Sequence, residues 1–136
     1  MPLTKQEISR GVVAILDGNA LLNDPLVKKD DHGFIGMRPF VCLRVYGDRS
    51  VWMLLTTQFR DKRLLLDQWK IPGSEKWMAE SQYLNDARKS FSGPSDSFIA
   101  SSKDERPYFP HKRPGISEDG LLAIEMEMPM RLKRRL

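Results

Sequence analysis

The chain has 136 residues, a formal net charge of +4 and a pI near 9.3, and 40% of its residues are hydrophobic while 29% are charged. This balance is typical of one folded domain and excludes a disordered chain. No apolar run reaches the roughly twenty residues that span a bilayer, and no secretory segment follows Met1, so we expect a cytoplasmic protein without membrane contact. The single cysteine, Cys42, lies in an apolar run, which excludes a disulfide framework and predicts a buried thiol.

The N-terminal third is predicted to hold one short strand and a long loop. Residues 4–9 are compatible with a helical turn, and the apolar run VVAIL at 12–16, which Gly11 and the Asp17-Gly18-Asn19 cluster bracket, predicts a strand. Residues 19–37 carry Asn, Asp, Pro and Gly without periodicity, which indicates a loop. Loops of this length in compact domains are often functional.

A β-hairpin is the clearest element of the sequence. Strands are predicted at 39–46 and 51–57, with the turn GDRS at 47–50 between them. Both arms, FVCLRVY and VWMLLTT, are apolar almost throughout rather than alternating. They therefore predict a sheet that is covered on both faces or wrapped into a small barrel.

The second half is predicted to contain the one substantial helix. Residues 63–66 are compatible with a strand, and Ser74 is a candidate N-cap for a helix over 75–91, with an apolar face made by Trp77, Leu84, Ala87 and Phe91. Further strands are expected at 97–101 and 121–128, on either side of a proline-rich loop at 105–115, and a basic tail occupies 131–136.

These elements predict an α+β, mostly β fold. We expect one domain over 1–136, built as a small, strongly bent β-barrel or sheet with one substantial helix and long loops. Residues 70–115 are a possible elaboration of that domain. The basic charge is compatible with a polyanionic partner, since clustered Lys and Arg attract phosphates.

The stretch HGFIGMRPFVCL at 32–43 places two cations before the first strand of the hairpin. His32 is a candidate proton donor or acceptor, and Arg38 is a candidate clamp for a phosphate or an oxyanion. The glycines at 33 and 36 would let the backbone approach a ligand closely. The alternatives are a solvated histidine and an arginine that caps the strand through a surface salt bridge.

The pattern His32-x-x-x-Gly36-x-Arg38-Pro39 before an apolar strand resembles the signature of the MazF/PemK (Kid-like) toxins. These are small ribonucleases of bacterial toxin–antitoxin pairs.

Two further stretches resemble the same family, in the family's order. Arg10-Gly11 before VVAIL is similar to the Arg-Gly that opens the family's first strand, and LLTTQ at 54–58 is similar to the end of its third strand. The resemblance covers residues 9–58. The loop before His32 is longer than the family's, GDRS is a tighter turn, and no match extends beyond residue 58.

The resemblance implies an SH3-like barrel that cuts single-stranded RNA without a metal or other cofactor. In this reaction the ribose 2′-hydroxyl attacks the adjacent phosphate, leaving a cyclic phosphate and a 5′-hydroxyl. Arg38, Thr57 and His32 would be the catalytic residues, with Arg38 on the phosphate because its planar fork binds two oxygens. His32 could exchange a proton near neutrality.

The expected substrate contacts include residues beyond this catalytic set. Thr56, Gln58 and Arg10 would bind RNA, and Lys112 with Arg113 on the proline-rich loop could form a second phosphate-contacting patch. The two threonines are also good strand formers that need no function. The resemblance further implies a protein antitoxin and a homodimer.

Two other functions remain open. A barrel similar to the CcdB toxins would poison a protein target such as gyrase, and the C-terminal residues 131–136 would then matter more than Arg38 and Thr57. A non-catalytic barrel that binds RNA or a partner protein is the third hypothesis.

Overall fold

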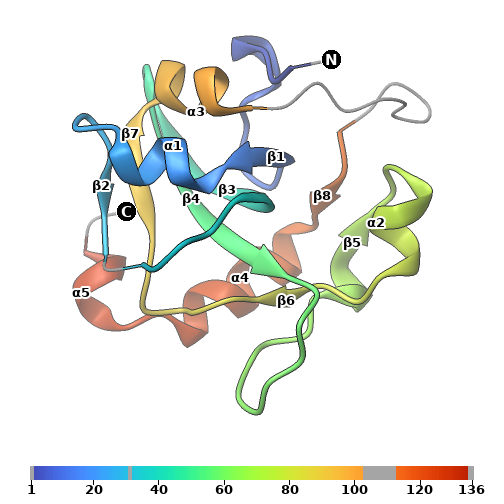
Figure 1. Ribbon diagram of the computed structural model, residues 1–136. Helices are drawn as coiled ribbons and strands as arrows, with labels where there is room; N and C mark the ends of the chain where they lie inside the picture. The colour runs from blue at the N-terminus through green and yellow to red at the C-terminus, as the bar shows by residue number, and fades with distance from the viewer. Residues whose placement is uncertain (1, 31, 103–112, 135–136) are drawn as a thin grey trace.

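The computed structural model describes residues 2–30, 32–102 and 113–134 (Figure 1). The fold is α+β and is organised around an antiparallel sheet with the strand order β1-β3-β4-β7-β2, from which β6 branches by pairing with the end of β4. Across the described residues this path is open, with β1 and β2 at its edges. The strands of this sheet are β1 (Val13–Asp17), β2 (Lys28–Lys29), β3 (Met37–Tyr46), β4 (Arg49–Thr56), β6 (Tyr83–Leu84) and β7 (Phe91–Pro94).

The remaining elements are short. A separate pair is formed by β5 (Lys70–Ile71) and β8 (Gly115–Ile116). The helices are η1 (Lys5–Glu7), α1 (Gly18–Asn23), η2 (Asp67–Trp69), α2 (Glu75–Ala79), α3 (Ser95–Ser101), α4 (Glu118–Glu127) and α5 (Met130–Lys133). None of the helices in the described ranges is long and apolar enough to cross a membrane.

The predicted hairpin is confirmed as β3 and β4. Their turn consists of Gly47 and Asp48, and Gly47 adopts a φ of +58°, which glycine reaches without steric cost. The register pairs Phe40 with Leu54 and shifts between Cys42 and Arg44, where an irregularity of the β-bulge type interrupts the ladder. Such a bulge bends its strand and increases the local twist.

Both faces of the hairpin are covered, as its apolar arms predict. Successive side chains of a strand point to opposite faces, and those of β3 and β4 accordingly divide between two core clusters. Phe40 and Trp52 pack in the first cluster with side chains of α1 and α3, and Val41 and Met53 pack in the second with those of α2, α4 and α5. Figure 1 shows α1 and α3 on one side of the sheet and α4 and α5 on the other. Cys42 is buried, as predicted.

The predicted strand at 12–16 is confirmed as β1, but the prediction of a loop over 19–37 is wrong in part. The Asp17 carboxylate accepts hydrogen bonds from the backbone N–H groups of Asn19 and Ala20, which starts α1 at Gly18. Lys28 and Lys29 form β2 by pairing with Ser92 and Phe91. That partner lies some sixty residues away, so local sequence contains no signal for β2.

The helix predicted over 75–91 is wrong in length, although Ser74 is its N-cap. α2 ends at Ala79, and the Lys70 ammonium donates hydrogen bonds to the carbonyls of Trp77 and Glu80, at 2.7 and 2.6 Å. This buried ammonium satisfies carbonyl groups that a longer helix would have used. The residues that follow form β6 and β7, both of which pair with β4.

The strands predicted at 97–101 and 121–128 are helices α3 and α4. Phe98 of α3 stacks on Trp52 with ring centroids 5.5 Å apart, so tertiary packing decides the conformation of this segment. In α4 the buried residues Leu121 and Ile124 follow helical spacing, and Met128 extends it just beyond the helix.

Three smaller predictions fare differently. At 63–66 only an isolated bridge between Leu65 and Tyr83 is present instead of a strand. Most of the proline-rich loop at 105–115 lies outside the described residues, and its last residue, Gly115, belongs to β8. The start of the basic tail belongs to α5. In place of the one substantial helix that was predicted, the described residues form several short helices.

Candidate functional site

Arg38 lies near the start of β3, where that strand pairs with β1. Its partner across β1 is Leu16, and its side chain is exposed. The guanidinium Nη1 makes one long hydrogen bond, 3.4 Å, to the carbonyl of Met37. The residue is therefore held in position by the sheet while its charged group faces solvent.

Thr56 ends β4 at the same end of the hairpin, because β3 and β4 run antiparallel. The last β3–β4 pair at this end joins Phe40 to Leu54, and Arg38 and Thr56 each lie two residues beyond it. The alternation of the strands places both side chains on the side of Phe40 and Leu54. The geometry therefore favours Thr56 over Thr57, which lies in the bend beyond the strand, as the hydroxyl on the same face and at the same end of the hairpin as Arg38.

The backbone before Arg38 is fixed by α1. The N–H of Gly18 donates to the carbonyl of Gly36 at 2.8 Å, and the N–H of Ile35 donates to the side-chain oxygen of Asn19 at 3.1 Å. Ile35 is buried in the first core cluster, and Gly36 has a φ of +74°, a conformation that favours glycine. Phe34 precedes this anchored pair, and its ring is exposed.

The segment after β4 is fixed by Arg63. The Thr56 hydroxyl accepts a hydrogen bond from the N–H of Gln58, whose carbonyl accepts from Arg63 Nη1 at 2.8 Å. Arg63 Nε donates to the carbonyl of Asn85 at 3.0 Å. Burial, together with the positive charge of Arg60, lowers the pKa of Arg63. Arg63 was not among the residues predicted from the sequence. The basic run at 59–63, directly after LLTTQ, is the local feature that could have drawn attention to it.

His32 lies against the first core cluster. Its ring stacks on Phe91 with centroids 4.8 Å apart, and Phe91 makes an edge contact with Phe40 at 5.3 Å. Phe40 lies two residues after Arg38 on β3. The structure therefore connects His32 with the start of β3 through two aromatic rings.

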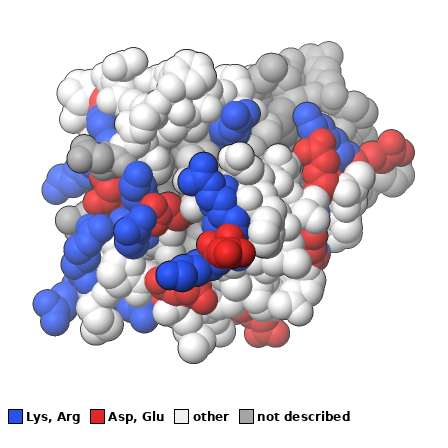
Figure 2. Space-filling model, turned by 60° about the horizontal axis from the view of Figure 1, so that its bottom comes forward, with Lys and Arg blue, Asp and Glu red and all other residues white. Residues whose placement is uncertain are grey.

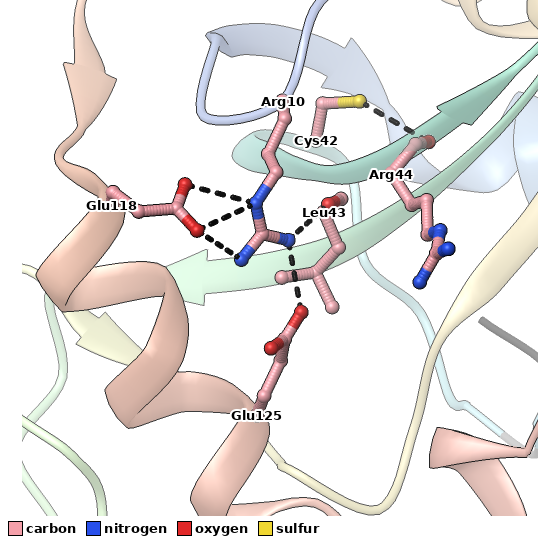
Figure 3. A network of polar contacts seen from close by, with 6 residues as sticks. All are labelled: Arg10, Cys42, Leu43, Arg44, Glu118 and Glu125. Atoms are coloured by element: carbon pink, nitrogen blue, oxygen red, sulfur yellow. Dashed lines mark hydrogen bonds and ion pairs between the residues drawn. The ribbon is translucent and has the colours of Figure 1, made fainter.

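Arg10 lies at the other end of β3, in a network of polar contacts with α4 (Figure 3). It binds the Glu118 carboxylate through Nε and Nη2 at 3.0 Å, and its Nη1 donates to Glu125 at 2.9 Å and to the carbonyl of Leu43 at 2.6 Å. The hydrogen bond between Arg10 and Glu118 raises the pKa of the arginine and lowers that of the glutamate. These contacts favour a structural role for Arg10, and its predicted contact with RNA stays a prediction.

Arg113 is also engaged within the protein. Its buried side chain forms an ion pair with Glu7, with 2.8 Å between Nε and Oε2. Burial raises the pKa of Glu7, but the hydrogen bonds from Arg113 and Thr4 outweigh it and hold that pKa below its usual value. Lys112 lies outside the described residues. The structure thus does not bring Arg113 to the end of the hairpin that carries Arg38.

Two other surface arginines, Arg88 and Arg131, are paired with acids. Figure 2 shows Lys and Arg gathering toward the α5 side of one face, with Asp and Glu among them. There Arg131 forms an ion pair with Asp30 at 3.2 Å, and Arg88 pairs with Asp86 at 3.0 Å. The net positive charge is therefore partly neutralised on this face.

The chemistry available at the Arg38 end of the hairpin is that of hydroxyl and guanidinium groups. In the described part of the chain, no cluster of three or more His, Cys, Asp or Glu side chains could hold a metal ion. The arrangement suits the binding of an anion such as a phosphate. No family model, curated protein or solved structure matches this chain.

Proposed function

We propose that this protein is an RNA-cleaving toxin similar to the MazF/PemK family, neutralised in the cell by a protein antitoxin. One observation carries the proposal. Arg38, the arginine of the pattern His32-x-x-x-Gly36-x-Arg38-Pro39, lies exposed at the same end of the hairpin as Thr56. An exposed guanidinium and a hydroxyl group on the same face at one end of a hairpin suit recognition of a phosphodiester.

In this reaction the ribose 2′-hydroxyl attacks the adjacent phosphate and the 5′-oxygen leaves. The Arg38 guanidinium would bind two phosphate oxygens and stabilise the additional negative charge of the transition state. The hydroxyl of Thr56 or Thr57 would donate a hydrogen bond to the same phosphate. His32 would exchange a proton with the attacking or the leaving oxygen, since its ordinary pKa lies near neutrality.

The proposal includes the SH3-like barrel that the family resemblance implies. β4 supports it, because one edge of this strand pairs with β3 while the other edge pairs first with β7 and then with β6. The bulge between Cys42 and Arg44 adds curvature next to these pairings.

The proposal also includes an antitoxin and a homodimer, which both need protein-binding surface. Leu122 and Met126 are exposed one turn apart on α4, and Met130 is exposed at the start of α5. Exposed apolar side chains that gather on one surface are typical of sites that contact another protein.

The test is incubation of the purified protein with mixed-sequence single-stranded RNA in EDTA, followed by mass spectrometry of the fragment ends. Arg38→Ala should lower the rate by about 10²- to 10³-fold, as expected for loss of one donor to the transition state. Arg44→Ala is the matched control, because Arg44 is an exposed arginine on the same strand, near its other end. It should cut at the unaltered rate.

Fragments that end in cyclic phosphate, produced with Arg44→Ala but not with Arg38→Ala, would establish the mechanism. Intact RNA in the presence of folded protein would refute the nuclease. The CcdB-like poison or the binding module would then be the better hypothesis.

A further inference from the structure

Phe34 and Phe59 are exposed aromatic side chains in the segments that lead into and out of the Arg38 end of the hairpin. Phe34 is 89% exposed and lies three residues before β3, and Phe59 is 67% exposed and lies three residues after β4. Single exposed apolar residues are common on proteins. Here two rings of the same type occupy corresponding positions, each three residues outside a strand of the hairpin, at the end that carries Arg38 and Thr56.

Phe34 is presented on a fixed backbone. The next residue, Ile35, is buried and its N–H is bound by Asn19, while the carbonyl of Gly36 is bound by Gly18. The Phe34 ring lies over Gly36, whose missing Cβ would be 3.5 Å from the ring. The ring thus lies near Gly36, two residues before Arg38 in the sequence, with its surface open to solvent.

Phe59 is held next to β6, which pairs with the end of β4. Its ring contacts Tyr83 edge-on, with centroids 5.9 Å apart, and Tyr83 is the strand partner of Thr56. The backbone next to it is fixed by the bond from Arg63 to the carbonyl of Gln58. Phe59 is therefore connected to Thr56 through a single residue, Tyr83.

The charge around Phe59 is complementary to a polyanion. Arg60 and Lys62 are exposed next to it, with Asp61 between them, and no ion pair is found for either cation among the described residues. Aromatic rings and nearby cations are the combination with which proteins bind single-stranded nucleic acids, because every base has a face that can stack. Because the backbone next to each ring is anchored, little more than side-chain freedom is lost when a base stacks on it.

We propose that Phe34 and Phe59 are stacking platforms for RNA bases on the two sides of the phosphate that Arg38 binds. This inference rests on the proposed function and identifies how the substrate is held. The partner that the two rings and the adjacent cations fit is an unpaired RNA strand. A base-paired duplex keeps its base faces stacked within the helix and leaves none for these rings.

The test measures binding alone, so that it is independent of cleavage. A mixed-sequence oligoribonucleotide with 2′-O-methyl groups throughout, labelled with fluorescein, cannot be cut by 2′-hydroxyl attack, and its Kd is measured by anisotropy. Phe34→Ala and Phe59→Ala should each weaken binding by about 5- to 150-fold, the range found for loss of one stacked base. Leu26→Ala, which truncates an apolar side chain that is 63% exposed near β2, should leave binding unchanged.

Two replacements separate stacking from simple apolar contact. Phe→Trp at either position should preserve binding, and Phe→Leu, which keeps an apolar side chain but removes the ring face, should weaken it as Ala does. Binding of the Ala variants within about twofold of the unaltered protein would overturn the inference, and so would Leu variants that bind as well as Phe. If the Ala variants change only sedimentation, the rings face a second protein chain instead.

The outcome for cleavage is read separately with unmodified RNA. Binding that depends on the two rings, without any cleavage, would refute the nuclease and retain the stacking platforms. Cleavage that depends on Arg38 but not on the rings would refute the stacking platforms and retain the nuclease.

Discussion

Replacement of Arg10 by methionine tests whether this arginine is structural or binds substrate. Methionine keeps an apolar stem and removes the guanidinium, so it deletes the contacts with Glu118, Glu125 and Leu43 without leaving a large cavity. If the network is structural, the protein should lose stability and retain its function once folded.

The contacts give the expected magnitude. A hydrogen bond from a charged donor to a partly buried carbonyl, here that of Leu43, contributes about 1.5–3 kcal/mol. The ion pair with Glu125 joins side chains that are 29% and 25% exposed, and it adds no more than about 1 kcal/mol. Such contributions are not additive. We therefore expect a loss of about 2–3 kcal/mol in the free energy of unfolding.

The assay is urea denaturation followed by circular dichroism. With a slope of about 2 kcal/mol/M, the midpoint should fall by about 1–1.5 M while the slope itself is unchanged. Glu125→Gln should lower the midpoint by less, and Glu118→Gln by less again, because the Glu118 side chain is 62% exposed. A midpoint that does not move, together with reduced RNA cleavage, would refute the structural interpretation and support the predicted substrate contact.

Three further predictions concern stability and reactivity. Gly120→Ala should destabilise the protein by about 1–2 kcal/mol in thermal or urea unfolding, because a Cβ there would lie 2.6 Å from Trp69 Cβ and overpacking outweighs the gain in helix propensity. Because the pKa of Glu7 is lowered, its ion pair with Arg113 stabilises the fold at any pH above the usual pKa of 4.5. This contribution is lost as the pH falls through the folded-state pKa. Glu7→Gln should therefore flatten the acid side of the profile of melting temperature against pH. Burial raises the pKa of Cys42 to about 12, so its thiol should react with a disulfide reagent only after unfolding.

A comparison variant or a contradicting result checks each of these predictions. Gly47→Ala should destabilise for a different reason, because its φ of +58° is strained for alanine although a Cβ there would meet nothing. An acid profile unaltered by Glu7→Gln would show that the ion pair does not contribute to stability. Labelling of Cys42 in the native protein at the rate of a free thiol would contradict its burial.

The hairpin and its two covered faces could be predicted because the information is local. Apolar and β-branched residues fill both arms between turn residues, and this pattern specifies strands with few alternatives. The location of Arg38 and Thr56 at one end of the hairpin follows from the same pattern. The sequence could not show, however, that Thr56 rather than Thr57, the predicted catalytic residue, shares a face with Arg38.

Elsewhere, contacts with distant residues override local propensity. The run at 97–101 resembles a strand by composition, but Phe98 packs on Trp52 and the segment is helical. α2 ends where the Lys70 ammonium donates hydrogen bonds to the carbonyls of Trp77 and Glu80, and nothing within 75–91 indicates these bonds. Sequence alone likewise could not show that Arg113 is paired with Glu7, because the two lie at opposite ends of the chain.

The strand order of the sheet also sets the order in which Arg38 and His32 reach their positions during folding. β3 and β4 are joined by a two-residue turn and can pair at once, whereas β7 reaches β4 only after the closure of residues 57–90, and β2 joins the sheet only on β7. Closing longer loops costs more entropy and slows folding. The stacking partner of His32 is Phe91, the first residue of β7. A chain still being synthesised, if it ends before Phe91, can therefore form the hairpin with Arg38 but cannot position His32, whose ring finds its stacking partner only once β7 has left the ribosome.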